Sequence, residues 1–219
     1  MLPNASFRFA LHESIVATER ANLHNLPTDC PQRDERMFWL NDATVRFEEL
    51  PFNFETGRLF PKIVHDIMDA QDEVGAIPCT VPFIYGTQPT DPVCSSFLIA
   101  VKQAYLHHGD TTLLREAYPA LCAWNDRIYQ MSNDGIVSNT LYGDWASPED
   151  CCMEIAPFSV VTPGAILSTG YCYYNARLLA RFAEILSLEQ DAAAHRNRAE
   201  MIRMAMLQKW LQEDGTFAS

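Results

Sequence analysis

The sequence predicts an all-α domain, and three observations support this prediction. Apolar residues recur at helical spacing in about seven segments, so most of the 219 residues have the pattern of amphipathic helices. Strand-like sequence is confined to one stretch, 136–145. Short turns marked by Gly, Asp and Pro separate the segments. Helices joined end to end with so little strand signal indicate a domain in which helices pack on helices.

Three helices are predicted in the first third of the chain. The first covers about 7–23, and a loop at 25–38 separates it from a short helix at about 41–50. The third covers roughly 55–70. Pro61 must either kink this helix or stand in its first turn, because proline lacks the N–H that a helix interior requires.

The next two helices are predicted together with the boundary between them. One begins near Pro92 and ends at Gly109, a residue suited to the left-handed position after a helix. Asp110 is then the predicted N-cap of the following helix, whose hydrogen-bond ladder Pro119 interrupts. The apolar positions of the pair are Phe97, Leu98, Val101, Ala104, Tyr105, Leu113, Leu114, Ala117, Leu121 and Trp124.

The last third of the chain begins irregularly and ends in helices. Residues 133–135 predict a turn, 136–145 could form short strands, and 146–161 has an irregular pattern. Thr162-Pro163 opens a long helix by the N-cap and N1 preferences, and Asp191 is the predicted cap of a final helix. The predicted core face of the long helix consists of Leu167, Tyr171, Tyr174, Leu178, Phe182 and Ile185. The final helix carries an apolar stripe that we expect to lack a packing partner, namely Ile202, Met206 and Trp210.

Charge and composition exclude several classes of function. The formal charge is −12, from 28 acidic and 16 basic residues, and no basic patch interrupts the acidic balance. We therefore expect no nucleic-acid partner and disfavour an acidic sugar as substrate. No run of about 18 apolar residues predicts a membrane span, so no membrane partner is expected. The first residues lack the features of a signal peptide, but such a segment would lie upstream if the chain is a fragment, so cytoplasm and periplasm both remain open.

The seven cysteines do not form a recognisable framework. They are odd in number, scattered along the chain and without a C-x-x-C pair. This pattern argues against a set of disulfides or a zinc cluster and favours reduced, mostly buried thiols.

The residues that favour a chemical function lie between the first two predicted helices. Segment 28–43 reads TDCPQRDERMFWLNDA and places four carboxylates, two arginines and a tryptophan in one loop. A charged loop could serve solvation alone, but Trp39 within it favours a sugar site. Carboxylates accept hydrogen bonds from vicinal hydroxyls, arginine donates in a fixed fork, and an aromatic face covers the apolar side of a sugar ring.

The loop also resembles a known family. Asp-Cys-Pro-Gln-Arg-Asp-Glu-Arg at 29–36, followed by Trp39 and Asp42, is similar to the signature loop of family 78 glycoside hydrolases, most of which are bacterial α-L-rhamnosidases. Further similar segments are Gly-Ala-Ile-Pro at 75–78, Asp91-Pro92, 105–110 and Tyr118-Pro119. The resemblance implies an (α/α)6-barrel fold. Residues 1–219 would then be a partial six-hairpin catalytic domain, an incomplete barrel with a few short strands, truncated before its carboxyl-terminal half.

The resemblance also implies roles for particular residues. Glu35 matches the general acid of the family, whose mechanism inverts the anomeric centre, and the catalytic base is expected beyond Ser219. The implied sugar-binding residues are Asp29, Arg33, Trp39, Asp42, Asp144 and Trp145. Trp145 could equally be a core tryptophan. We expect burial under Trp39 and repulsion from neighbouring carboxylates to keep Glu35 protonated.

The resemblance implies a partner and the absence of a cofactor. The substrate would be a rhamnose-containing carbohydrate, and hydrolysis by an acid and a base needs neither a metal nor an organic cofactor. Glu149, Asp150 and Glu154 are further acids near the site, but their spacing matches no base motif, and none is assigned. The chain alone would therefore be inactive.

Departures from the family pattern keep two alternatives open. Residues 93–97 read Val-Cys-Ser-Ser-Phe where Trp-Gly-Asp-Ala is frequent in the family. Phe38 and Leu40-Asn41 stand where Gly and Thr-Gly are common. These changes flank the sugar pocket, so they bear on the preferred sugar more than on the reaction. One alternative is an α-glycosidase of the same barrel for another sugar, and the other is a non-catalytic carbohydrate-binding half-barrel.

Overall fold

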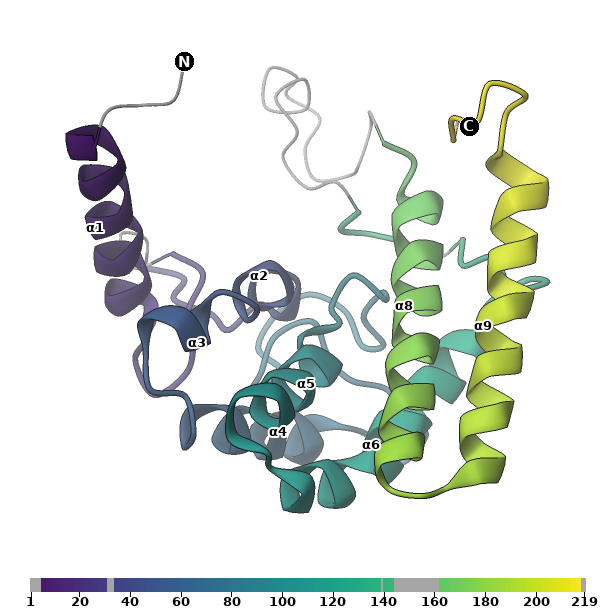
Figure 1. Cartoon of the computed structure of the whole chain (residues 1–219), viewed down its shortest axis with the longest axis horizontal. Coiled ribbons are helices and arrows are strands. Elements are labelled where there is room, and N and C mark those ends of the chain that lie inside the picture. Colours follow the sequence, from purple (N-terminus) through teal and green to yellow (C-terminus); the bar gives the residue numbers. More distant parts are fainter. Residues whose placement is uncertain (1–4, 31–33, 139, 144–161, 218–219) are drawn as a thin grey trace.

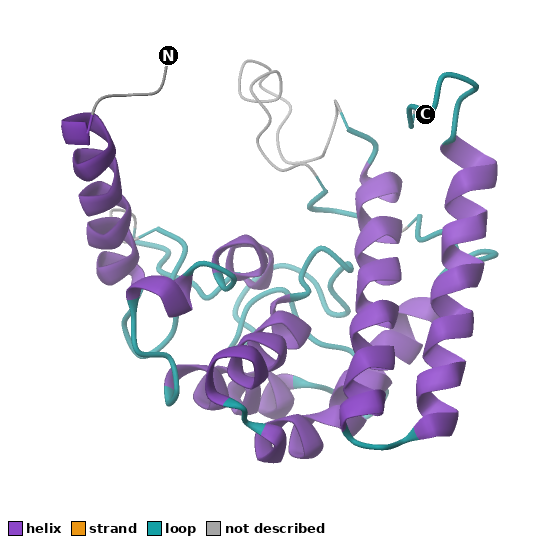
Figure 2. Ribbon diagram, in the orientation of Figure 1, coloured by secondary structure: helices purple, strands orange, loops and turns teal. Residues whose placement is uncertain are grey.

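A computed structural model describes residues 5–30, 34–138, 140–143 and 162–217. Within these ranges every regular element is a helix, as the sequence predicts (Figures 1 and 2). Pairing between extended segments is limited to isolated β-bridges in the described residues, such as the bridge from Trp39 to Thr80. In the stretch where strands were expected, one bridge joins Asn133 to Ile136 across the predicted turn, and residues 144 and 145 lie outside the described part.

The first helices follow the prediction with one correction. Helix α1 covers Ala5–Asn22, and α2 covers Leu40–Arg46. The single helix expected at 41–50 is wrong, because a separate short helix α3, Leu50–Asn53, follows α2 after a turn. Pro51 stands in the first positions of α3, where its missing N–H costs nothing, whereas it could not extend α2.

The middle helices confirm the predicted boundary at Gly109 and Asp110, but the first two begin later than expected, the second at Ser96 instead of near Pro92. Helix α4, Leu59–Ala70, begins later than expected and has Pro61 in its first turn, so the helix is not kinked there. Helix α5, Ser96–His108, ends at Gly109, whose φ of 65° is left-handed. Asp110 caps α6, Thr111–Gln130, by accepting a hydrogen bond from the Leu113 N–H at 2.9 Å. Helix α6 continues through Pro119.

The last two helices form an antiparallel pair (Figure 1). Helix α8, Gly164–Ile185, has Pro163 at its N-cap, so the predicted N-cap at Thr162 and N1 position of Pro163 are wrong by one residue. Helix α9, Glu189–Trp210, begins before Asp191, so the predicted cap at Asp191 is wrong. The Asp191 carboxylate instead accepts a hydrogen bond from the Tyr118 hydroxyl at 3.3 Å and so joins α9 to α6.

The helices form an open arc with α5 at its centre. Helix α5 packs against α2, α4, α6 and α8, and it is buried along most of its length. Helix α1 stands at one end of the arc and the α8–α9 pair at the other (Figure 1). The largest fully buried side chains are Trp124, Phe38, Phe47, Phe60, Phe97 and Phe182. This arrangement is the incomplete α/α barrel that the sequence predicts.

The apolar stripe of α9 is not free of partners. Ile202 and Trp210 are buried, and Ile202 belongs to the main core. Met206 packs against the same core and approaches Gly170 of α8. The expectation of an unpartnered stripe is therefore wrong, because α8 packs along α9 and the turn at Gly135 lies against Ile202.

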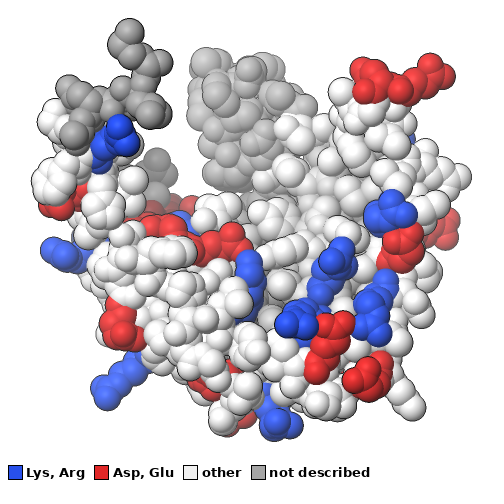
Figure 3. Space-filling model, viewed as in Figure 1, with Lys and Arg blue, Asp and Glu red and all other residues white. Residues whose placement is uncertain are grey.

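The charged side chains are mixed on the face shown in Figure 3. Over α8 and α9 the arginines lie among acidic residues. Ion pairs there join Arg181 and Arg196 to Glu184, and Arg203 to Glu200. None of the described helices combines the length and the apolar character needed to cross a membrane.

Candidate functional site

The motif segment, residues 28–43, begins as a loop that is held at two points before α2. The Arg46 guanidinium of α2 donates two hydrogen bonds to the Glu19 carboxylate of α1, at 2.9 and 3.0 Å, and one to the Thr28 carbonyl at 2.8 Å. Because the planar fork of arginine matches a carboxylate, this contact sets the direction in which the loop leaves α1. Farther along, the Asp29 N–H donates to the Met37 carbonyl at 3.1 Å and closes the loop.

Closure of the loop brings two carboxyl groups and a thiol together. The side-chain ligand atoms of Asp29, Cys30 and Glu35 lie within 4.8 Å of one another. Burial raises the pKa of Asp29, but hydrogen bonds from the side chains of Glu35 and Cys30 outweigh burial, so the pKa lies below its ordinary value. Such a trio could hold a cation, although exposed acidic groups commonly lie this close without one.

Glu35 does not lie where the sequence analysis expected it. Its side chain is exposed, so the predicted burial under Trp39 is wrong. The group in contact with Glu35 is the half-buried carboxyl of Asp29, six residues earlier in the same loop.

Asp42 extends the acidic cluster into the first turn of α2. Burial raises the pKa of its carboxyl, and the nearby negative charge of Asp29 raises it further. Asp29 therefore interacts with both Glu35 and Asp42.

Trp39 is held between two tyrosines. Its ring centre lies 6.2 Å from that of Tyr85 and 5.8 Å from that of Tyr142, and both pairs have edge-to-face geometry. The turn that carries Tyr85 needs glycine at position 86, where φ is 95°. A side chain there would overlap the Cys79 sulfur and lie 3.0 Å from the Tyr142 hydroxyl. The half-exposed Trp39 ring is thus fixed in orientation.

A buried carboxylate fixes the loop after α6. Oδ2 of Asp91 accepts hydrogen bonds from the Leu141 and Tyr142 N–H groups, both at 2.8 Å. Only 5% of Asp91 is exposed, and burial raises the pKa of its carboxyl. In the sequence, Asp91-Pro92 stands out only as part of the resemblance, and this role of Asp91 is not evident. No local pattern indicates it, because the partners lie 50 and 51 residues away.

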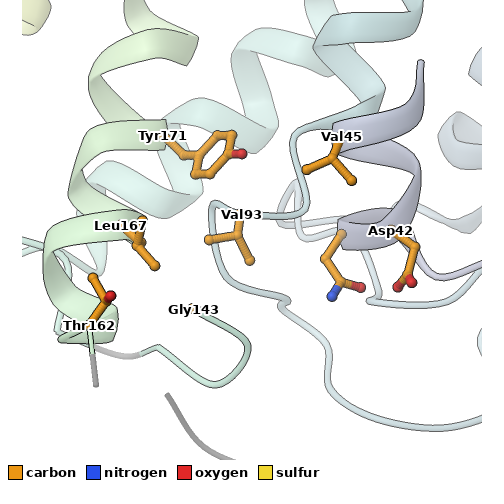
Figure 4. A pocket seen from close by; sticks show the side chains of 8 residues that line it. Asp42, Val45, Val93, Gly143, Thr162, Leu167 and Tyr171 are labelled. Carbon is orange, nitrogen blue, oxygen red and sulfur yellow. The ribbon is translucent and has the colours of Figure 1, made fainter. Parts of the chain in front are cut away.

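A pocket of about 480 Å³ lies between α2 and the start of α8 (Figure 4). Its lining residues are Asn41, Asp42, Val45, Val93, Gly143, Thr162, Leu167 and Tyr171. Leu167 and Tyr171 were predicted as core residues of the long helix. They do pack against the core, but they also line this pocket, which the helical periodicity alone could not indicate.

The predicted site residues divide into two groups. Asp29, Glu35, Trp39 and Asp42 are described and lie in or beside the motif loop. Arg33, Asp144 and Trp145 fall outside the described residues, as do Glu149, Asp150 and Glu154. Gly143, which directly precedes Asp144, lines the pocket.

The chain is similar to known proteins over nearly its whole length. Residues 7–219 match the family described as the bacterial α-L-rhamnosidase 6 hairpin glycosidase domain. A curated α-L-rhamnosidase of Streptomyces avermitilis is 30% identical over 210 residues, which cover 94% of this chain and 19% of that protein. Another, from Formosa agariphila, is 29% identical over 189 residues, covering 84% of this chain and 20% of that protein. The chain thus spans about a fifth of the length of these relatives.

The chain is also similar to solved structures of α-L-rhamnosidases. The α-L-rhamnosidase from Dictyoglumus thermophilum has a TM-score of 0.91 and 31% identity, and the match covers 100% of this chain and 25% of that one. The Streptomyces avermitilis α-L-rhamnosidase complexed with L-rhamnose has a TM-score of 0.86 and 27% identity. That match covers 99% of this chain and 20% of the other.

Proposed function

The chain belongs to the family of bacterial α-L-rhamnosidase six-hairpin glycosidase domains, and we propose that it supplies the general acid and part of the sugar site of an enzyme that hydrolyses terminal α-L-rhamnosyl residues. We also propose that residues 1–219 act within a longer six-hairpin catalytic domain. The several-fold greater length of the relatives supports this second proposal.

Glu35 is the proposed general acid, and its contact with Asp29 is the observation on which this assignment rests. A hydrogen bond between two carboxyl groups requires one proton between them. The lowered pKa of Asp29 suits the role of ionised acceptor, and we propose that Glu35 holds the shared proton. A protonated carboxyl that is also exposed can reach the glycosidic oxygen of a bound substrate.

The proposed sugar-binding groups come from the same segment, 28–43, and from residues 144 and 145. Asp42 would accept hydrogen bonds from sugar hydroxyls at the pocket wall, and Trp39 would place its fixed ring against the apolar side of the sugar. Asp29 would serve both as partner of the acid and as a binding group. The remaining proposed residues, assigned from the motifs alone, are Arg33, Asp144 and Trp145.

The proposed mechanism inverts the anomeric centre. Glu35 gives its proton to the leaving oxygen as the bond to the sugar breaks, and a second carboxylate removes a proton from the water that attacks the opposite face. The two carboxyl groups must stand roughly 6.5–9.5 Å apart to admit that water. We propose that the second carboxylate comes from a segment of the enzyme outside these 219 residues. The reaction transfers the glycosyl group to water, with one proton given to the leaving oxygen and one taken from the water, so it calls for no cofactor.

The assignment is tested with Glu35→Gln in the full-length enzyme. We expect a loss of about 10²–10⁴-fold in kcat on a natural rhamnoside, since the amide cannot donate a proton. The loss should be smaller on an aryl rhamnoside whose leaving group needs little protonation. The matched control is Asp34→Asn at the adjacent exposed carboxylate, which should change binding more than turnover. Near-normal rates for Glu35→Gln on both substrates, together with an inactive Asp34→Asn variant, would show that Glu35 is not the general acid.

A further inference from the structure

The motif loop accounts for only one wall of the pocket. Asn41, Asp42 and Val45 come from α2, whereas the opposite wall comes from the start of α8. Figure 4 shows the Tyr171 ring extending from α8 toward α2, with its hydroxyl oxygen foremost and Val93 beneath it. Tyr171 thus faces the α2 wall that carries Asp42 across the pocket.

The Tyr171 hydroxyl differs from its neighbours on the same helix. The Tyr174 hydroxyl accepts a hydrogen bond from Lys102 Nζ at 2.9 Å, and the Tyr173 hydroxyl accepts one from Arg177 at 2.9 Å. Among the described residues, the Tyr171 hydroxyl has no hydrogen-bond partner, although its side chain is half-buried. A polar group in such a place normally has a partner, and here the pocket is the open direction.

The chemistry of Tyr171 complements that of Asp42. Burial raises the pKa of the Tyr171 phenol, and the charge of Glu48 raises it further, so the hydroxyl keeps its proton and can donate. Ionised Asp42 can only accept hydrogen bonds. An acceptor on one wall and a donor on the other suit a ligand that carries several hydroxyls around a ring. Val93 and Leu167 between them offer apolar contact to its C–H groups.

We propose that Tyr171 is a specificity-determining residue whose hydroxyl donates a hydrogen bond to one hydroxyl of the sugar held by Asp42. This inference rests on the proposed function, because it takes the pocket to be the sugar site of a glycosidase. It adds a sugar contact from α8, which lies outside the motif loop and outside Gly-Asp-Trp at residues 143–145.

The test is Tyr171→Phe in the full-length enzyme, because this change removes one oxygen and keeps the ring. The matched control is Tyr173→Phe on the same helix, whose hydroxyl contacts only an exposed arginine among the described residues. Both variants and the wild type are assayed on an aryl α-L-rhamnoside and on its 2-, 3- and 4-deoxy analogues. Circular dichroism and thermal melting check that the variants are folded.

Tyr171→Phe should lower kcat/KM on the parent rhamnoside about three- to tenfold, the usual value of one hydrogen bond. On the one deoxy analogue that lacks the contacted hydroxyl, it should cause no further loss. Tyr173→Phe should match the wild type on every substrate. An unchanged kcat/KM for Tyr171→Phe on the rhamnoside, or an equal loss on all four substrates, would overturn the inference.

The same assays separate this inference from the proposed function. Wild-type activity on rhamnosides, with no selective effect of Tyr171→Phe, refutes the role of Tyr171 and leaves the proposed function intact. Wild-type activity on a different glycoside refutes the proposed sugar, and the same variants then test Tyr171 on deoxy analogues of that glycoside. A wild-type enzyme that hydrolyses no glycoside overturns both.

Discussion

At the scale of single residues, the acidic cluster divides its carboxyl groups by environment. Asp29 has a pKa below its ordinary value because it accepts hydrogen bonds from Glu35 and Cys30. Asp42 has a raised pKa because it is partly buried and lies near the Asp29 charge. Neighbouring carboxyls whose environments push their pKa values apart are typical of sites that perform acid–base chemistry.

Asp42 should reduce the stability of the protein while supporting its activity. Its folded-state pKa lies above the ordinary value of 3.8, so ionisation favours the unfolded chain. Above the folded-state pKa, Asp42→Asn should therefore raise the melting temperature. The gain should vanish below pH 3.8, where the aspartate is protonated in both states. The same substitution should lower kcat/KM on rhamnosides at neutral pH, because the amide is a weaker acceptor for sugar hydroxyls.

Thermal melts of the full-length enzyme from pH 3 to pH 7 would measure this effect. Asp69→Asn, at an exposed carboxylate on α4, serves as the control and should change the melting temperature little across this pH range. A melting temperature for Asp42→Asn that falls at neutral pH would show that the charge stabilises the fold, contrary to this prediction.

At the scale of elements, the site depends on contacts that hold loops against helices. The Arg46–Glu19 pair fixes the start of the motif loop, and Asp91 fixes the loop that reaches Gly143. Asp91 precedes α5, the most buried helix, so the loop is tied to the rigid centre of the arc. A site built on such supports keeps its geometry better than one on free loops.

The anchoring role of Asp91 predicts different outcomes for two substitutions. Asp91→Ala removes the acceptor of two N–H bonds and leaves buried donors unpaired, at a cost of about 1–3 kcal/mol each in the free energy of unfolding. It should also lower kcat/KM by releasing the loop next to the pocket. Asp91→Asn keeps one oxygen acceptor and removes a buried charge, so its losses should be much smaller. Denaturant unfolding and rhamnoside kinetics on both variants test this; equal effects of Ala and Asn would exclude an acceptor role.

At the scale of the whole molecule, the arc exposes apolar side chains at its α1 end. Leu11 and Ile15 lie four residues apart along α1 and are 51% and 42% exposed. The amino-terminal turns of α1 extend away from the other described elements (Figure 1). A helix with an uncovered apolar stripe tends to associate.

We therefore predict that the 219-residue protein, produced alone, self-associates and does not hydrolyse an aryl rhamnoside. Sedimentation velocity should show oligomers, and Leu11→Gln with Ile15→Gln should shift the distribution toward monomer. As a control, substitution of the exposed Met201 and Met204 on α9 by Gln should shift it less, because they form no such stripe on a projecting helix. A monomeric, cooperatively melting and active 219-residue protein would contradict both parts of the prediction.

The sequence by itself determined the features that depend on neighbouring residues. Helical periodicity gave the all-α class, and the Gly109 and Asp110 boundary was correct because caps are contacts within one turn. The motif placed Asp29, Glu35, Trp39 and Asp42 in one region because they lie within 14 residues of one another. Local signals also failed in two places, because the Asp191 cap and the continuous 41–50 helix were both predicted from neighbouring residues and both are wrong.

Only the tertiary structure decided which side chains meet across the fold. Three features join distant segments of the chain. They are the hydrogen bonds from the Leu141 and Tyr142 N–H groups to Asp91, the ring contacts of Trp39 with Tyr85 and Tyr142, and the position of Tyr171 on the pocket wall. Helical spacing shows that Tyr171 shares a face with Leu167, but not whether that face meets core or cavity. That choice depends on how α8 packs beside α5 and α2, which is a property of the whole arc and not of any short segment.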